Sequence, residues 1–250
     1  MTLEIQKLCK DFSGIKAVKD LDLVLEQGKI TALIGPNGAG KTTIFNLITG
    51  FLHPTAGQIV WKNREISQNP PYSTMRAGIS RTFQEVKLFR SLTVGENLLM
   101  AKRQRTYDGL LAGFLQRKSI EKDTSKHLEE VTSFLRKLHL ADKLDAPASA
   151  LSYGQSKLVE ILRAILSSPC LLMLDEPVAG LNPAIISILK QLIVSVVKEK
   201  GITLLFIEHN IPFVLELADH VVVVDHGVKI AEGPPEKIRN DPEVIRAYLG

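Results

Sequence analysis

The segment Gly35-Pro36-Asn37-Gly38-Ala39-Gly40-Lys41-Thr42 constrains the fold of this chain more than any other part of its sequence. Its first and sixth residues are glycine, and a lysine and a hydroxyl residue end it, which matches the pattern of a phosphate-binding loop. The apolar run Ile30–Ile34 predicts a strand before the loop, and the apolar spacing after Lys41 predicts a helix that Gly50 stops. The chain is therefore expected to have an α/β fold that places a helix N-terminus beside an anion.

Each position of this loop has a chemical task. Its glycines let backbone N–H groups turn toward the β-phosphate of a nucleotide, and the helix dipole points its positive end at the same anion. Lys41 can reach the β- and γ-phosphates, and the hydroxyl of Thr42 can ligate Mg²⁺. The alternative interpretation is a glycine-rich turn without a ligand. The strand and the helix on either side favour phosphate binding over that alternative.

Length and composition allow a large α/β domain, or a core with a smaller attached lobe, and we expect the second arrangement. The chain has 250 residues, 45% of them hydrophobic, and a formal net charge of +4, which does not argue for a nucleic-acid partner. Cys9 and Cys170 have no metal-ligand spacing, so reduced thiols of a cytosolic protein are expected.

The N-terminal segment Met1–Lys7 alternates apolar with polar residues and carries Glu4, which does not suit a secretory signal. A protein that stays inside the cell is expected. The uncharged stretch Thr42–Trp61 is interrupted by glycine, proline and polar residues, so it is not predicted to span a membrane. Any membrane role therefore needs a partner.

An acidic pair follows a second predicted strand. The run Leu171–Leu174 has the continuous apolar character of a strand buried on both faces, and it ends at Asp175, Glu176 and Pro177. We expect Asp175 to hold Mg²⁺ through water opposite Thr42. Since side chains alternate along a strand, Glu176 is expected to face the other way, toward the water that attacks the γ-phosphate. The alternative, a solvated acidic strand end, is the weaker interpretation beside a phosphate loop.

Two further polar residues are candidates for the same chemistry. A third predicted strand, Ile202–Ile207, ends at Glu208 and His209, and His209 is suited to donating to the γ-phosphate or orienting Glu176. Gln84 can ligate Mg²⁺ through its side-chain carbonyl while touching the attacking water. Taken alone, each residue has an ordinary alternative, because a single histidine is usually structural and a single glutamine indicates nothing.

The rest of the chain predicts its organisation. Asn182-Pro183 caps a helix that Gly201 closes, and a hairpin joins Val221–Val224 to Val228–Ala231. Asp241-Pro242 caps a final helix. Residues 85–150 are charged and helical in pattern, which indicates a helical lobe inserted into the core.

The segment Leu151-Ser152-Tyr153-Gly154-Gln155 precedes another predicted helix. Its serine and glycine stand at a helix N-terminus, which is a potential second anion site. On local evidence an ordinary serine N-cap is the favoured alternative.

These motifs, in this order, resemble the ATP-binding cassette (ABC) family over nearly the whole chain. Residues 35–43 resemble Walker A, Gln84 the Q-loop, 151–155 the signature, Asp175 and Glu176 Walker B with its catalytic glutamate, and His209 the switch. The resemblance implies a P-loop NTPase core with a mainly parallel sheet, an N-terminal antiparallel β portion and an inserted helical subdomain. It implies one cassette domain over residues 1–250, with a core at 1–84 and 151–250 and a helical subdomain at 85–150.

The resemblance also implies ATP hydrolysis with Mg²⁺ held by Thr42, Gln84 and Asp175. Two cassettes of this family meet head to tail, so the signature of one chain closes on the nucleotide of the other. Phe12 matches the aromatic residue that stacks on adenine, with a core phenylalanine as the alternative. The implied nucleotide-binding residues are Phe12, Gly35, Pro36, Asn37, Gly38, Ala39, Gly40, Lys41, Thr42, Thr43 and, from the second cassette, Ser152, Gly154 and Gln155.

Within the family, the chain looks like the ATPases of branched-chain amino acid importers. The similarity lies in Arg81-Thr82-Phe83-Gln84, in 93–99, in Ala179-Gly180-Leu181-Asn182-Pro183 and in the C-terminal residues 240–250. Urea or amide importers and the lipopolysaccharide-export ATPase look similar and stay open as alternatives. The implied partners are membrane permease subunits, a second cassette of the same or a sibling chain and, indirectly, a solute-binding protein at the cytoplasmic face of the inner membrane.

Alternatives from other classes are a soluble ABC-type ATPase acting on nucleic acid and a nucleotide sensor without turnover. The single cassette without basic arms disfavours the first, and Glu176 and His209 disfavour the second. Two departures from the broad family pattern stand out: Tyr153 replaces a common glycine, and Asn182 stands where many cassettes have aspartate.

Overall fold

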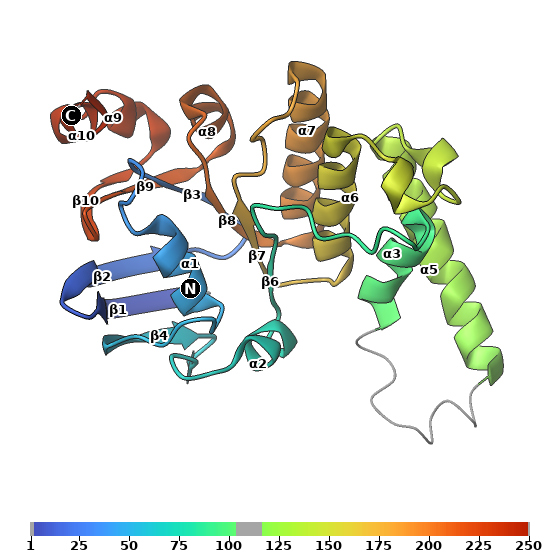
Figure 1. Cartoon of the computed structure of the whole chain (residues 1–250), viewed down its shortest axis with the longest axis horizontal. Helices are drawn as coiled ribbons and strands as arrows, with labels where there is room; N and C mark the ends of the chain where they lie inside the picture. The colour runs from blue at the N-terminus through green and yellow to red at the C-terminus, as the bar shows by residue number, and fades with distance from the viewer. Residues whose placement is uncertain (1–2, 104–116, 250) are drawn as a thin grey trace. The chain divides into compact units, whose positions relative to one another are not determined.

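The computed structural model describes residues 3–103 and 117–249. The chain divides into two compact units. Figure 1 labels their helices and strands. The first comprises the residues up to Arg81, Cys170–Val178 and the chain from Val194 onward, and the second comprises Thr82–Pro169 and Ala179–Ile193.

A six-stranded sheet organises the first unit. In spatial order its strands are β10 (Val228–Gly233), β9 (His220–Asp225), β3 (Ile30–Ile34), β8 (Thr203–Ile207), β7 (Leu171–Asp175) and β6 (Ile79–Arg81). All neighbours are parallel except β9 and β10, which form the predicted hairpin. Strands β3, β7 and β8 are buried along their whole length, as their mostly apolar sequences predict. Because these three strands are parallel, the polar residues after each lie at one edge of the sheet.

A second sheet is antiparallel throughout and confirms the predicted N-terminal β portion. Its strand order is β2 (Ile15–Leu25), β1 (Leu3–Phe12), β4 (Ala56–Trp61) and β5 (Arg64–Glu65). Helix α1 (Lys41–Ile48) contributes Ile44 and Phe45, both fully buried, to one apolar cluster with both sheets. The phosphate loop before α1 is therefore held on a helix fixed between two sheets.

Shorter helices complete the first unit. They are α2 (Pro71–Arg76), α8 (Ile211–Leu217), α9 (Pro235–Arg239) and α10 (Pro242–Leu249). Phe213 of α8 packs edge-on against Phe206 of β8 with ring centroids 5.9 Å apart, which holds α8 against the sheet. The backbone N–H of Glu243 donates to Asp241 Oδ1 at 2.9 Å, confirming the predicted cap of the last helix.

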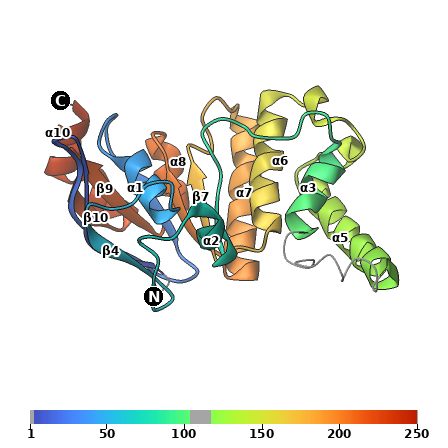
Figure 2. The same cartoon turned by 60° about the horizontal axis from the view of Figure 1, so that its bottom comes forward.

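The second unit is helical. Its elements are α3 (Val94–Arg103), α5 (Arg117–Lys137), η1 (Ala141–Lys143), η2 (Ala148–Ala150), α6 (Tyr153–Leu166) and the first part of α7 (Pro183–Lys200). Figure 2 shows α6 and α7 side by side. The predicted lobe at 85–150 lies within this unit, but the unit is larger and includes α6 and residues 179–193. Residues 104–116 of that predicted lobe lie outside the described residues.

The entry to α3 is fixed by two sets of side-chain hydrogen bonds. Thr93 and Glu96 form a reciprocal pair, in which each backbone N–H donates to the other side chain at 2.8 and 3.1 Å. Asn97 is fully buried, donates to the carbonyls of Phe89 and Thr93, and accepts the N–H of Phe89 at 2.9 Å. The segment before α3 is therefore held in one conformation although it has no regular structure of its own.

Over residues 3–103 and 117–249, no helix is long and apolar enough to cross a membrane.

Candidate functional site

The phosphate loop lies where two other backbone segments leave no room for side chains. A Cβ on Gly35 would lie 2.0 Å from the carbonyl oxygen of Val224, and one on Gly40 would lie 2.5 Å from that of Ala17. Gly40 also has a φ of +99°, in the left-handed region. The two glycines that define the motif are therefore demanded by close packing as well as by the turn.

The hairpin turn between β9 and β10 braces this loop. The N–H of Gly227 donates to the carbonyl of Ala39 at 3.0 Å, and the N–H of Lys19 donates to the carbonyl of Gly227 at 2.8 Å. The C-terminal helix also comes close to this loop, because burial raises the pKa of Tyr248 and the backbone N–H of Gly35 opposes that rise. Sequence reasoning identified the hairpin and the last helix but not their role in supporting the loop.

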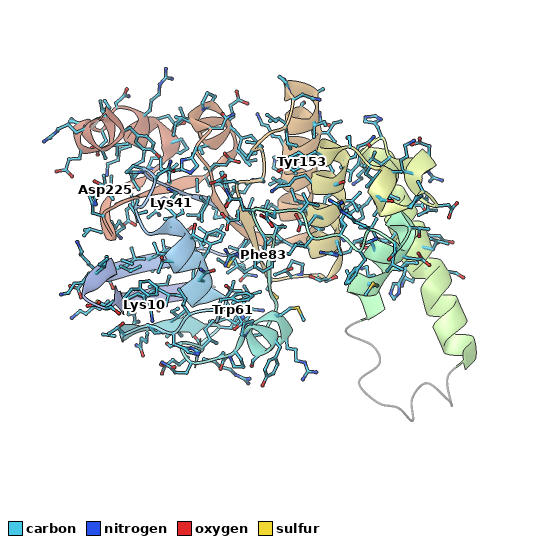
Figure 3. The ribbon with its side chains drawn as sticks, viewed as in Figure 1. Lys10, Lys41, Trp61, Phe83, Tyr153 and Asp225 are labelled. Atoms are coloured by element: carbon cyan, nitrogen blue, oxygen red, sulfur yellow. The ribbon has the colours of Figure 1, made fainter. Side chains whose placement is uncertain are left out.

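Lys41 is the first residue of α1 and is only 6% exposed (Figure 3). Its Nζ donates to the carbonyls of Gly35 and Pro36, both at 2.8 Å. Burial lowers the pKa of Lys41, and the charges of Glu176 and Asp175 oppose that change. The ammonium and the two carboxylates therefore share one electrostatic site, as the two motifs predicted.

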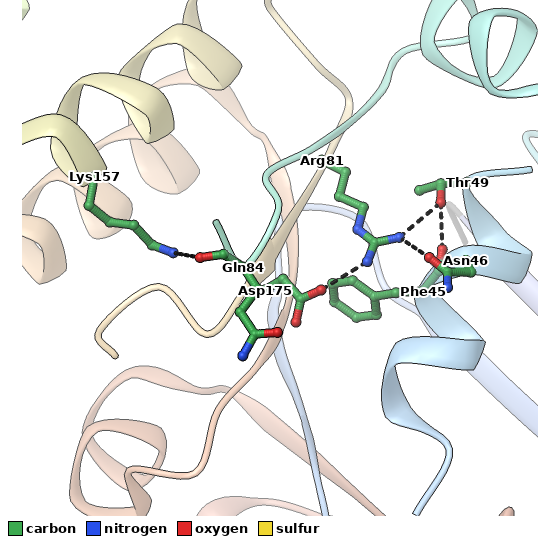
Figure 4. Close-up of polar contacts among 7 residues, drawn as sticks. All are labelled: Phe45, Asn46, Thr49, Arg81, Gln84, Lys157 and Asp175. Carbon is green, nitrogen blue, oxygen red and sulfur yellow. Dashed lines mark hydrogen bonds and ion pairs between the residues drawn. The ribbon is translucent and has the colours of Figure 1, made fainter. Parts of the chain in front are cut away.

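Asp175 is the last residue of β7 and is 5% exposed. Its Oδ2 lies 2.8 Å from Nη2 of Arg81, the last residue of β6 (Figure 4). Nη1 of Arg81 donates to Oδ1 of Asn46 on α1 at 2.7 Å. The acidic residue is thus tied through one guanidinium to the helix of the phosphate loop. Sequence reasoning noted Arg81 only as part of a motif and missed this ion pair.

Glu176 lies outside the strand that precedes it. Strand β7 ends at Asp175, so the prediction that strand alternation orients Glu176 was wrong in its reason. Instead Glu176 has a φ of +48°, in the left-handed region, and its N–H donates to the carbonyl of Ile207 at 3.0 Å. A non-glycine residue there costs about 1–2 kcal/mol, and such strain clusters at functional sites.

His209 lies beside Glu176, as the second of its two predicted roles requires. His209 Nε2 is 3.3 Å from Oε1 of Glu176. The preceding Glu208 is 3% exposed and accepts the N–H of Val178 at 2.8 Å and that of His209 at 3.0 Å. Burial raises the pKa of Glu208, and these N–H donors oppose the rise. Glu208 therefore links the turn after β7 to the turn after β8. The sequence did not reveal this role, because it shows only a glutamate at the end of an apolar run.

Phe12 ends β1 and is 42% exposed, so the alternative of a core phenylalanine is wrong. Lys10 Nζ lies 5.1 Å from its ring centroid. An exposed ring with a cation nearby offers a stacking surface.

The signature segment belongs to the second unit and starts α6 at Tyr153 (Figure 3). Ser152 is its N-cap and accepts the N–H of Gln155 at 3.3 Å, while the side chain of Gln155 accepts the N–H of Ser152 at 2.9 Å. The serine cap favoured on local evidence is thus present, as a reciprocal capping box. A Cβ on Gly154 would lie 2.4 Å from Ile185 Cδ1, so that side chain would have to move.

Three side chains of α6 hold the backbone around Gln84. Lys157 is fully buried, and its Nζ donates to the carbonyl of Gln84 at 3.2 Å (Figure 4). Glu160 accepts the N–H of Lys87 at 3.0 Å, and Arg163 donates to the carbonyl of Lys87 at 2.6 Å. These contacts lie within the second unit and fix the predicted Q-loop to the helix that the signature begins.

The structure therefore gathers the predicted site residues in two groups. Lys41, Thr42, Asp175, Glu176 and His209 share the sheet edge of the first unit, with Phe12 on the neighbouring antiparallel sheet. Gln84, Ser152, Gly154 and Gln155 belong to the second unit.

The oxygen donors of the first unit suit Mg²⁺, which is commonly bound by one or two carboxylates together with substrate phosphates. Asp175 supplies a carboxylate and Thr42 a hydroxyl at the start of α1. No cluster of three His, Cys, Asp or Glu side chains arranged for a metal occurs in the described part of the chain. The donor set fits a nucleotide-bound Mg²⁺ and differs from an all-protein metal cage.

Comparisons with known proteins show which family this chain resembles. The family model described as ABC transporter matches residues 18–179, and one described as branched-chain amino acid ATP-binding cassette transporter matches residues 228–250. The chain is 42% identical to LivG of Escherichia coli, a high-affinity branched-chain amino acid transport ATP-binding protein, over 99% of this chain and 97% of that protein. It is 41% identical to BraF of Pseudomonas aeruginosa, which has the same description, with the same coverage.

Solved structures extend the similarity to the fold. A nucleotide-free ATP-binding cassette from an ABC transporter superimposes with a TM-score of 0.83 at 35% identity, covering 100% of this chain and 99% of that one. The ADP conformation of the cassette MJ1267 superimposes with a TM-score of 0.84 at 33% identity, covering 100% and 98%.

Proposed function

Since the chain belongs to the ABC transporter family, we propose that it is the ATP-hydrolysing subunit of an importer of branched-chain amino acids. The observation that carries this proposal is the identity of 42% to LivG over 99% of the chain. The urea, amide and lipopolysaccharide alternatives have less support, because BraF and LivG are both named for branched-chain amino acids. The same relatives disfavour an ATPase acting on nucleic acid.

For the binding step we propose that the loop 35–43 cradles the phosphates of ATP and that Lys41 moves from the loop carbonyls to the β- and γ-phosphates. The exposed ring of Phe12 stacks on the adenine. Thr42, Asp175 and Gln84 would hold Mg²⁺, and the ion would supply charge neutralisation at the phosphates.

For the chemical step we propose that Glu176 orients the attacking water and accepts its proton. His209, 3.3 Å from that carboxylate, positions it, and the left-handed backbone at Glu176 places this residue outside β7. The lowered pKa of Lys41 does not abolish its charge role, because phosphate oxygens favour the protonated ammonium.

We propose that two cassettes, identical or siblings, close head to tail, so that Ser152, Gly154 and Gln155 of one complete the nucleotide site of the other. The α6 N-terminus supplies N–H groups and a positive dipole end for this contact. The rigidly held segment before α3 receives a short helix from a membrane permease, which the solute-binding protein meets from the other side. The working place is then the cytoplasmic face of the inner membrane.

Replacing Glu176 with Gln tests the catalytic assignment. Phosphate release should nearly vanish while ATP-dependent dimers accumulate, as seen by gel filtration of the purified chain. Near-normal turnover would refute the role of Glu176.

The cargo requires the complete transporter. We expect the native complex, reconstituted in liposomes with its permease and binding protein, to accumulate labelled leucine in an ATP-dependent manner. Uptake of urea or short amides without leucine uptake would reassign the substrate while leaving the ATPase intact.

A further inference from the structure

We propose that Arg81 is a positioning residue that fixes the Asp175 carboxylate before Mg²⁺ arrives, and so sets the Mg²⁺ concentration at which the site works. The proposal rests on the proposed function, in which Asp175 holds the metal. Three contacts of the Arg81 side chain carry the proposal.

The guanidinium of Arg81 joins two elements that carry site residues. Its Nη2 is 2.8 Å from Asp175 Oδ2, at the end of β7. Its Nη1 donates to Asn46 Oδ1 at 2.7 Å and to Thr49 Oγ1 at 3.3 Å, both on or beside α1 (Figure 4). Thr49 Oγ1 itself donates to the carbonyl of Phe45 at 2.6 Å, which leaves its oxygen to accept from Arg81. The guanidinium therefore links Asp175, at the end of β7, to the C-terminal half of α1.

Burial restricts the movement of the Arg81 guanidinium. The side chains of Arg81 and Asp175 are 6% and 7% exposed, and the guanidinium carbon lies 5.3 Å from the ring centroid of the fully buried Phe45. A charged hydrogen bond removed from water is stronger than the same bond on the surface, and a planar guanidinium gives it a fixed direction. A lysine has a point charge and cannot reproduce both arms in that plane.

The consequence is a carboxylate whose Oδ2 is held by Arg81. Each carboxylate oxygen has more than one acceptor site, so Asp175 would be able to serve Mg²⁺ while it stays bonded to Arg81. Because α1 pins the guanidinium from the other side, the cation cannot swing away with the carboxylate. Without Arg81, the buried carboxylate would lose a partner that orients it, and that loss weakens its hold on Mg²⁺.

A purely electrostatic role for Arg81 predicts the opposite change in Mg²⁺ affinity. If Arg81 were only a counter-charge, its removal would make the site more negative, and Mg²⁺ would bind more tightly. The direction of the change therefore separates the two roles.

The experiment titrates Mg²⁺ into the full-length chain with a fluorescent ATP analogue and compares Arg81→Met with Arg76→Met, which removes an exposed arginine of α2 in the same unit. For Arg81→Met we expect the half-saturating Mg²⁺ concentration to rise by about tenfold, the scale of one lost charge-assisted bond. Nucleotide affinity in EDTA should change by less than about threefold, because the phosphate loop is intact. Arg76→Met should behave as wild type.

An unchanged or lower Mg²⁺ midpoint for Arg81→Met would overturn the proposal, even if the melting temperature fell. Arg81→Lys serves where the methionine variant does not fold: it keeps a charge near Asp175 but cannot span to Asn46, so its midpoint should also rise, and a wild-type midpoint would overturn the proposal. A failure of the proposed function would look different from a failure of the Arg81 proposal. It would show as an unaltered ATP affinity of Lys41→Ala, measured in EDTA.

Discussion

His209 Nε2 lies 3.3 Å from Glu176 Oε1, and this contact joins the residues that follow two adjacent parallel strands, β8 and β7. The backbone N–H of Glu176 reaches the carbonyl of Ile207 on the same neighbouring strand. The carboxylate that we propose as the base is thus held by a side chain and by its own backbone. Its position depends on the neighbouring strand more than on the strand that it follows.

Replacing His209 with Ala should lower the turnover number by about a hundredfold, because a positioned base contributes about 10²–10⁴ to a rate. ATP affinity should change little, since Lys41 and the loop are untouched. Steady-state phosphate release and equilibrium nucleotide binding together give this separation. His226→Asn is the control, because His226 is an exposed histidine of the hairpin turn whose side chain is 88% exposed.

A double variant checks that His209 acts through Glu176. In Glu176→Gln the base is already lost, so adding His209→Ala should lower turnover by far less than a further hundredfold. Fully additive losses would show that His209 acts on the phosphate directly.

Replacing Glu176 with Gly should stabilise the protein while abolishing turnover. Its φ of +48° costs a side chain about 1 kcal/mol, and glycine adopts that conformation freely. The melting temperature without nucleotide should therefore rise by about 2–4 °C, the scale expected for a domain of this size. Glu176→Gln controls for lost charge, since it removes the carboxylate and keeps the strained backbone. An equal rise of the melting temperature in both variants would mean that losing the carboxylate charge, and not relieving the strained backbone, stabilises the protein.

Local motifs predicted the frame of the site well. The start of α1 at Lys41, the end of β7 at Asp175 and the cap at Ser152 all follow from residues within a few positions of one another. Patterns of that kind are set by turn chemistry and by apolar periodicity, which a sequence displays directly.

The supporting contacts could not be predicted, because each joins residues far apart in the chain. Arg81 meets Asp175 across 94 positions, and Lys157 meets the carbonyl of Gln84 across 73. A buried arginine or lysine looks like a surface residue in the sequence, since such residues are mostly exposed. The position of Glu176 was predicted for the wrong reason, because no sequence pattern marks a left-handed glutamate.

Changing Ser152 separates its cap from its proposed role at the partner's nucleotide. Ser152→Ala should destabilise the nucleotide-free protein by about 1 kcal/mol, because the capping box with Gln155 is lost. ATP-dependent dimers of the Glu176→Gln protein should also weaken. Ser152→Asp keeps a capping oxygen but places a carboxylate against the partner's γ-phosphate.

The expected outcome for Ser152→Asp is a melting temperature close to wild type together with a loss of ATP-dependent dimers on gel filtration. Normal dimers in this variant would contradict the contact between Ser152 and the partner's phosphate, and a melting temperature as low as that of Ser152→Ala would contradict the role of the cap.

Glu160 should make the stability of the protein depend on pH. It is 3% exposed, its Oε1 accepts the Lys87 N–H, and no described residue forms a hydrogen bond with its Oε2. Burial raises the pKa of Glu160, and the Lys87 N–H and the charges of Lys157, Arg163 and Lys87 oppose the rise. Folding therefore favours the protonated acid.

The raised pKa of Glu160 fixes the direction in which its contribution to stability changes with pH. Below the ordinary glutamate pKa of about 4.3, the side chain is neutral in both states, and its contribution to stability is fully present. As pH rises from there through the raised folded-state pKa, the unfolded chain loses its proton first, and the contribution is lost. Glu160→Gln stays neutral throughout, so it lacks this loss.

We therefore expect the melting temperature of Glu160→Gln, relative to wild type, to rise as pH increases from about 4 to neutrality. Calorimetry at several pH values without nucleotide measures this difference. Glu129→Gln, on the exposed surface of α5 in the same unit, should show a smaller and flatter difference. A Glu160→Gln difference that stays constant or falls with pH would mean that Lys157 and Arg163 keep Glu160 ionised, and that the Q-loop is held by an ion pair instead of a neutral acid.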